Sequence, residues 1–406
     1  MITAQVTQRP LPTSYHGRIV EHLRAAEPGL WNWFSSTQKR RGEADAVRLD
    51  LLKSTYRLEP QAQIRLYALA NEVRDELGLT CSVTLYQAQT AVAMNAALAY
   101  LPGEAHIILA GPLGTVLSDH ELRAVLAHEL AHFLLYEEAG GDYLVAADLL
   151  RALAADTSAG PSASESARLY ALWTEIYADR WALHVCGELT AAVATLIKIQ
   201  TGLSDVSAES YLRQAEEVFA KANTPADGAS HPESYIRARA LRLWAEQGDQ
   251  AQAEFERMIE GGLMLNRLDL LGQVRAADLT RHFLQLLLSP RWFQTDAVLA
   301  HARQFFPEFV LPPNAPTDDA IKAALDRGGC SLRDYLCYLM LDFATVDRDL
   351  GDVVLAASIV LARRLGFADR FAELVHKELT LSNKAFTKIE KDAEAILAKT
   401  EAAPLS

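Results

Sequence analysis

The stretch His128-Glu129-Leu130-Ala131-His132 is the most informative part of this chain of 406 residues. Side chains four residues apart on a helix lie one turn above each other, with Cβ atoms about 5–6 Å apart. Two imidazoles at that spacing can bind one tetrahedral Zn²⁺ at about 2.0–2.1 Å, and the carboxylate of Glu129 can polarise a metal-bound water. The stretch therefore predicts a hydrolytic zinc site, with a pair of hydrogen-bonded core histidines as the alternative.

The residues around this motif predict a long, buried helix. Ser118 is the expected N-cap, and Glu121 is the expected partner that completes a capping box. Between Val125 and Tyr136, Glu129 is the single charged residue. Because a buried carboxylate is costly unless a partner compensates its charge, we expect Glu129 to belong to a functional site.

A catalytic zinc site needs a third protein ligand, since its fourth position is left to water or substrate. A direct continuation of the motif does not supply one, because Leu135 and Glu138 stand where glycine and histidine would be required. The better candidate is Glu175, which shares a helix face with Asp179. One of these carboxylates can bind the metal while the other accepts the ring N–H of a ligand histidine.

Two alternatives remain open for this second segment. Glu175 and Asp179 could form a solvated helix face, paired with Arg168 or Arg180. His184 is a rival ligand on the same helix, although it follows Glu175 by more than two turns.

Four sequence blocks with distinctive residues follow one another between positions 82 and 241. They are residues 94–96 with 106–113, residues 117–132, residues 175–179, and residues 230–232 with Arg237 and Leu241 downstream. In this order they resemble the gluzincin zinc metallopeptidases that include HtpX and the CAAX prenyl proteases. The resemblance implies a zincin-type catalytic domain with a small β-sheet and an active-site helix.

The resemblance also implies a role for each matching residue in the site. His128, His132 and Glu175 would bind Zn²⁺. Glu129 would be the general base and later return the proton. His231 would donate a hydrogen bond to the developing oxyanion, an interaction that is strongest in the transition state.

Three further positions receive supporting roles from the same resemblance. Asp179, which would orient a ligand imidazole, and Arg237 would lie directly behind the metal ligands. Asn95 and the strand around residues 106–109 would present backbone to an extended peptide, as β-strand addition requires. An ordinary edge strand is the alternative here, and for His231 it is a loop histidine before a helix, because Ser230 and Pro232 are typical of a helix start.

Patterning along the chain predicts a mainly α (α+β) fold. Helical periodicity is clear over residues 60–77, whereas residues 80–86 and 105–109 are typical of strands. After the motif, residues 142–155 are expected to form a helix and residues 157–166 a loose linker, so the insertion from 137 to 166 could form a wall or lid over the cleft. We expect an N-terminal helical segment that packs on the catalytic domain (1–80), a zinc metallopeptidase domain (81–245), a helical connector (246–312) and a helical interaction domain (318–406).

The C-terminal region carries a second resemblance. Residues 341–352 and 356–366 are similar to segments of the all-helical TerB-like domains, although the usual Ala-Asp-Gly signature is altered. A solvated acidic turn between two helices is therefore favoured over a metal site for the aspartates in this region, namely Asp342, Asp347, Asp349 and Asp352. We expect this domain to bind a partner protein or another copy of the chain.

Composition narrows the possible partners and compartment. A net charge of −13 argues against nucleic acid or an anionic membrane surface as the main partner. The apolar runs fall short of the ~20 residues that span a bilayer, and the first residues lack the pattern of a secretory signal. We expect a cytoplasmic protein whose four cysteines are reduced, since their spacing is not that of a zinc finger: Cys81, Cys186, Cys330 and Cys337.

These observations together predict a soluble zinc-dependent metalloendopeptidase that acts on protein or peptide substrates. Peptide bonds would be hydrolysed by Glu129-assisted attack of zinc-bound water. The alternative is a non-catalytic or latent peptidase-like adaptor that acts through its helical C-terminal domain.

Overall fold

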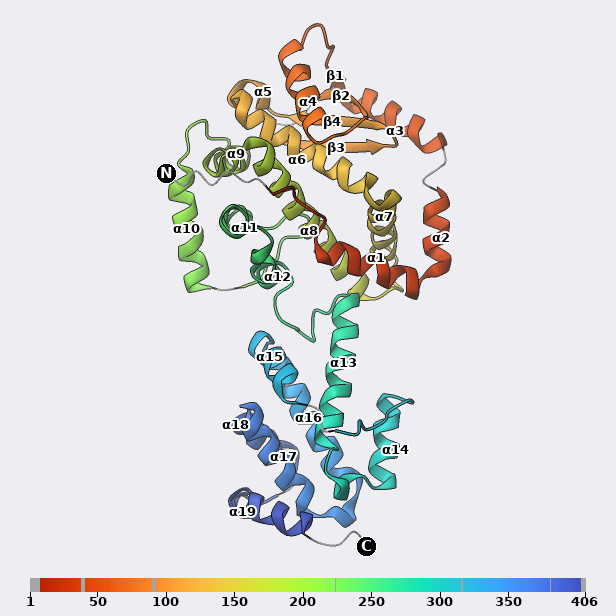
Figure 1. Cartoon of the computed structure of the whole chain (residues 1–406), viewed down its shortest axis with the longest axis vertical. Helices are drawn as coiled ribbons and strands as arrows, with labels where there is room; N and C mark the ends of the chain where they lie inside the picture. Colours follow the sequence, from red (N-terminus) through yellow and green to blue (C-terminus); the bar gives the residue numbers. More distant parts are fainter. Residues whose placement is uncertain are drawn as a thin grey trace. The chain divides into compact units, whose positions relative to one another are not determined.

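The computed structural model describes residues 8–37, 41–89, 93–222, 224–314, 317–379 and 381–402. The chain divides into two compact units, Met1–Gly261 and Gly262–Ser406. The first unit combines helices with one four-stranded sheet, and the elements of the second unit are all helical (Figure 1). The predicted mainly α (α+β) fold with an all-helical C-terminal region is thereby confirmed.

Both units contain part of the predicted connector. Residues 246–261 belong to the first unit, and residues 262–312 belong to the second. The finer division of the chain at residues 80, 245 and 312 remains a prediction.

The sheet has the strand order β1-β2-β4-β3, with β4 in its interior. β4 (Glu104–Ala110) pairs in parallel with β2 (Ser82–Ala88) and antiparallel with β3 (Asn95–Leu101), while β1 (Thr55–Arg57) pairs with β2. The turn between β3 and β4 consists of Pro102 and Gly103, whose φ of 76° suits glycine.

This strand order corrects one expectation about substrate binding. Residues 106–109 lie in β4, whose two edges are already paired, so that strand cannot accept a further strand. Among the described residues, the outer edge of β3 has no strand partner. The open edge therefore belongs to β3, which begins at Asn95.

The motif lies on α6 (Asp119–Glu137), a helix whose start follows the predicted capping box. The Ser118 hydroxyl accepts a hydrogen bond from the Glu121 amide at 3.3 Å, and the Glu121 carboxylate accepts one from the Ser118 amide at 2.9 Å. Lys198 pairs with the same carboxylate at 2.7 Å, which fastens α9 (Leu189–Thr201) to the start of α6. Figure 1 shows α6 between the sheet and α8 (Pro161–Cys186).

A hydrophobic core holds these elements together. It joins α4 (Ile64–Glu76), the sheet, α6 and α8, and its buried members include Ile107, Leu130 and Tyr177. α6 and α8 are both buried along most of their length. Packing on all sides therefore fixes which of their residues face each other.

The insertion after the motif is more regular than expected. The helix predicted over residues 142–155 is present as α7 (Asp142–Ala155). The predicted linker over residues 157–166 is wrong in its second half, because α8 begins at Pro161, where proline at the first helical position is favourable. α7 buries Val145 and Leu149 and packs along α8, α1 and α2.

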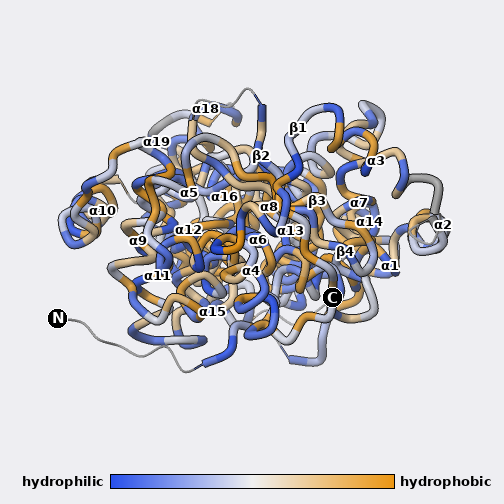
Figure 2. Tube along the Cα trace, turned by 90° about the horizontal axis from the view of Figure 1, so that it is seen from above, coloured by the Kyte–Doolittle hydropathy of each residue, from blue (hydrophilic) through white to orange (hydrophobic). Residues whose placement is uncertain are grey.

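The remaining helices of the first unit complete the scaffold: α1 (Ser14–Ala26), α2 (Pro28–Thr37), α3 (Arg41–Ser54), α5 (Leu113–Val116), α10 (Ala208–Lys221), α11 (Ser234–Gln247) and α12 (Gln252–Ile259). α10 shows a mixture of hydrophilic and hydrophobic residues in Figure 2, as expected of an amphipathic helix that buries one side.

The second unit is a helical array with its own hydrophobic core. Its helices are α13 (Leu270–Leu287), α14 (Asp296–Phe305), α15 (Asp319–Arg327), α16 (Cys330–Val346), α17 (Asp352–Leu365), α18 (Ala368–Glu378) and α19 (Asn383–Glu401). Two of the four aspartates considered above as a metal site have protein partners: Asp342 pairs with His301 at 2.7 Å, and Asp347 accepts a hydrogen bond from Thr295 at 2.7 Å.

A buried histidine on α1 makes stability depend on pH. His16 is fully buried; its Nδ1 accepts a hydrogen bond from the Thr13 amide at 3.2 Å, and its Nε2 lies 3.1 Å from the Thr174 hydroxyl on α8. Burial, helped by the charge of Arg180, lowers the pKa of His16 from 6.5 to about 3. The folded protein therefore keeps this imidazole neutral at pH values where the unfolded chain protonates it.

We predict that the free energy of unfolding falls as the pH falls from about 6.5 towards 3, by up to about 1.4 kcal/mol per pH unit from His16. His16→Asn, which keeps an acceptor for the Thr13 amide, should show a shallower dependence in denaturant titrations between pH 7 and pH 5. Parallel curves for the wild type and His16→Asn would contradict this assignment.

Candidate metal centre

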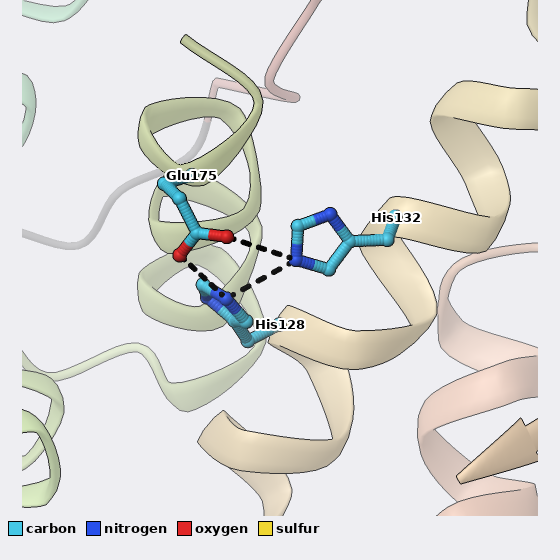
Figure 3. A group of neighbouring side chains, drawn as sticks. All are labelled: His128, His132 and Glu175. Atoms are coloured by element: carbon cyan, nitrogen blue, oxygen red, sulfur yellow. Dashed lines mark hydrogen bonds and ion pairs between the residues drawn. The ribbon is translucent and has the colours of Figure 1, made fainter. Parts of the chain in front are cut away.

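Three side chains from two helices converge on one point (Figure 3). Nε2 of His128 lies 3.3 Å from Nε2 of His132 and 3.3 Å from Oε2 of Glu175, and Nε2 of His132 lies 3.5 Å from Oε1 of Glu175. A tetrahedral site with bonds of about 2.0–2.1 Å places neighbouring ligand atoms about 3.3–3.4 Å apart. The spacing of the two imidazole nitrogens therefore matches an edge of a tetrahedral zinc site, and each nitrogen lies within 3.5 Å of one of the two oxygens of Glu175.

Electrostatics at this point favour a cation. Burial alone would lower the pKa of His128, but the charges of Glu175 and Asp179 outweigh it and raise that pKa to about 10. Burial would raise the pKa of Glu175, yet His128 and Arg237 lower it to about 2. Within the described part of the chain, the buried Oε2 atom of Glu175 accepts no hydrogen bond. A metal ion would replace the proton on His128 and satisfy Glu175, so the donor set fits Zn²⁺.

Asp179 and Arg237 support the ligands from behind. Asp179 Oδ1 lies 3.1 Å from Nδ1 of His128, so a neutral His128 that donates its Nδ1–H there turns Nε2 towards Glu175. Arg237, on α11, donates two hydrogen bonds to Asp179 at 2.8 and 2.6 Å and lies 3.6 Å from Glu175. Although burial raises the pKa of Asp179, Arg237 and His128 hold it well below its usual range.

The structure excludes a solvated helix face at Glu175 and Asp179, paired with Arg168 or Arg180. Glu175 and Asp179 are each only 6% exposed, so they do not form a solvated face. Arg168 pairs with Glu165, and Arg180 donates to the carbonyl of Leu11.

His184 is not brought to the ligand group. Its ring packs edge-on against Trp181 at 5.4 Å, and it does not line the cleft.

Glu129 is buried beside the ligand group and faces β3. Burial raises its pKa to about 7, although the positive charge of His128 opposes the increase. The Leu98 amide of β3 stabilises the ionised carboxylate by a hydrogen bond. Glu129 therefore lies between the metal ligands and the open edge strand.

His231 approaches from the loop that precedes α11. Its Nε2 lies 3.5 Å from Oε1 of Glu175, and its Nδ1 lies 2.8 Å from the Ser230 hydroxyl. Its side chain is 55% exposed, in contrast to the buried ligands. The structure thus places His231 at the rim of the ligand group.

One cleft of about 660 Å³ joins these groups. Asn95 lines it together with other residues of β3, and no residue of the insertion from 137 to 166 does. Sequence reasoning missed the cleft walls formed by α9 and by Tyr136: Ala192, Thr195, Leu196, Ile199 and Gln200 come from an apolar helix without a motif. The one available signal for Tyr136 was its position one turn after His132 on the same helix.

Comparison with known proteins agrees with this geometry. Residues 60–245 match the family model described as Peptidase family M48. This segment belongs to peptidase family M48. The resemblance of this segment to the gluzincins is therefore confirmed, and the family implies a metallopeptidase, which is a hydrolase.

The M48 segment contains the residues assigned to the site by sequence. No curated protein and no solved structure gave a match to the chain. None of the described helices combines the length and the apolar composition needed to cross a membrane.

We predict that Asp179→Asn lowers zinc affinity by about 10- to 100-fold, because the amide loses the charge that orients His128 and balances Arg237. Competition with a chromogenic chelator measures this directly. Asp148→Asn, an aspartate on α7 paired with Arg151 at 2.7 Å, is the matched control and should keep wild-type affinity. Equal affinities for both variants would show that Asp179 does not support the metal.

Proposed function

We propose that this protein is a zinc-dependent metalloendopeptidase that cleaves protein or peptide substrates. The observation that carries the proposal is the convergence of His128, His132 and Glu175, whose nearest nitrogen and oxygen atoms lie 3.3–3.5 Å apart, beside the buried carboxylate of Glu129. A structural zinc site closes all four positions with protein ligands, whereas three ligands at an open cleft leave one position for substrate or water.

His128, His132 and Glu175 would hold the ion, with Asp179 and Arg237 behind them. When bound there, Zn²⁺ supplies a Lewis acid that polarises a peptide carbonyl and lowers the pKa of water.

Glu129 would move the proton. Its carboxylate follows the first ligand directly on α6 and faces the cleft, so it can accept a proton from the attacking water. It can then return that proton to the leaving amine. His231, at the rim, would donate a hydrogen bond from its ring to the developing oxyanion.

The edge of β3 would bind the substrate backbone. Residues 95–98 of this strand line the cleft together with the two residues before it, and the outer edge of β3 has no partner among the described residues. An extended peptide can add to such an edge by main-chain hydrogen bonds. Asn95, at the start of β3, is the proposed substrate-binding residue of this wall.

The proposed compartment and the proposed interaction region are supported by the cysteines and by the second unit. The four cysteines are unpaired, which supports a reducing, cytoplasmic environment. The second unit has its own core, which supports a separately folded interaction region for a partner or a second copy.

The test compares bound zinc and peptide hydrolysis in the wild type and in Glu129→Gln. We expect zinc content to be unchanged and hydrolysis to fall by about 10²- to 10⁴-fold, because the amide cannot accept the proton. Asp148→Asn, an aspartate on α7 that pairs with Arg151 and does not line the cleft, should retain wild-type activity.

Two results would contradict this proposal. Hydrolysis that survives Glu129→Gln would exclude the mechanism. Zinc retained by a wild type that cleaves no member of a peptide library would favour the non-catalytic adaptor.

A further inference from the structure

The position of His231 depends on its loop and little on its own side chain. The ring is 55% exposed, and its contacts are the Ser230 hydroxyl at 2.8 Å and Glu175 at 3.5 Å. A side chain with so few contacts does not fix its own location. Whatever holds the backbone of residues 224–232 therefore determines where the imidazole lies.

Arg168 of α8 holds that backbone by two hydrogen bonds. Its Nη1 atom donates to the carbonyl oxygens of Ala226 and Gly228, each at 3.1 Å. The other side of the guanidinium donates to both carboxylate oxygens of Glu165, at 2.9 and 2.7 Å. This fork orients the guanidinium, whose side chain is only 13% exposed.

Gly228 transmits this restraint to His231. A Cβ atom at position 228 would lie 1.9 Å from the His231 carbonyl oxygen, so the two backbones are in direct contact. Any shift of Gly228 must therefore shift His231. The second hydrogen bond of Arg168 ends on this glycine.

Other hydrogen bonds hold the loop to different elements. The Ala226 amide donates to the Met258 carbonyl of α12 at 2.7 Å, and the Asp227 amide donates to Glu233 at 3.0 Å. The second of these bonds connects the loop to the metal ligands only through α11, whose Arg237 is hydrogen-bonded to Asp179. Arg168 connects the loop to the helix that carries Glu175 itself, because it precedes Glu175 by seven residues, two turns along the same face of α8.

We infer that Arg168 is a positioning residue for His231, which fixes the distance between the imidazole and the metal centre through the carbonyls of Ala226 and Gly228. α8 then sets both the third ligand and the oxyanion donor. The catalytic consequence of this role rests on the proposed peptidase function. The restraint on the loop does not depend on activity.

The first test is a double-mutant cycle on kcat. Arg168→Gln should lower kcat by about 10- to 100-fold with KM and zinc content unchanged, since misplacement by about 1 Å has effects of that size. In a His231→Ala background the same change should have almost no further effect. Arg168→Lys, which can reach one carbonyl but lacks the fork, should recover part of the loss.

Two more variants sharpen the cycle. Gly228→Ala should lower kcat as Arg168→Gln does. In the His231→Ala background it should have almost no further effect on kcat. Arg151→Gln, which removes an arginine from the pair with Asp148 on α7, is the matched control and should keep wild-type kcat. Losses that add in the double variants would overturn the inference, because they would show that Arg168 acts through something other than His231.

The second test needs no catalysis. Hydrogen–deuterium exchange of metal-free and zinc-loaded protein should show the amides of residues 224–232 exchanging about tenfold faster in Arg168→Gln, with α6 and α8 unchanged. Unchanged exchange in the loop, or faster exchange throughout the unit, would overturn the inference. A wild type without hydrolysis but with this loop response would refute the peptidase proposal and leave the restraint by Arg168 standing.

Discussion

The hydrogen-bonded pairing of Arg237 with Asp179 is the interaction on which the buried site depends. Glu129, Glu175 and Asp179 are buried carboxylates that line the same cleft, and burying even one unpaired charge costs several kcal/mol. Arg237 balances one of them and orients it by two hydrogen bonds. When all three carboxylates are ionised, two negative charges remain, which a divalent cation balances. Folding of the metallopeptidase segment and metal binding therefore depend on the same balance of buried charges.

Local signals in the sequence predicted the parts of the fold that follow from neighbouring residues. The capping box at Ser118 fixed the start of α6, and the spacing of the two histidines fixed their common face. β2 and β4 were recognised from alternating or β-branched residues. Glu175 was proposed as the third ligand from the helix face that it shares with Asp179 and from the resemblance to the gluzincins, since no local rule pairs residues as far apart as His132 and Glu175.

The missed elements lack such local signals. β3 is rich in alanine, which has low strand propensity, and it forms because β4 offers a partner across a two-residue turn. Residues 161–166 contain serine and proline, which are typical of loops, yet they form the first turns of α8, where Ser162 and Ser166 are buried. Tertiary contacts decided both cases, as they also decided that α9 would form a wall of the cleft.

The open edge of β3 has a consequence for extended chains other than the substrate. The strand from Asn95 to Leu101 carries no charged residue, and uncharged edges are templates for pairing with any extended chain. A peptide bound there uses the row of amides and carbonyls that any other strand would need, so occupation of this edge by the substrate also protects it from unspecific pairing.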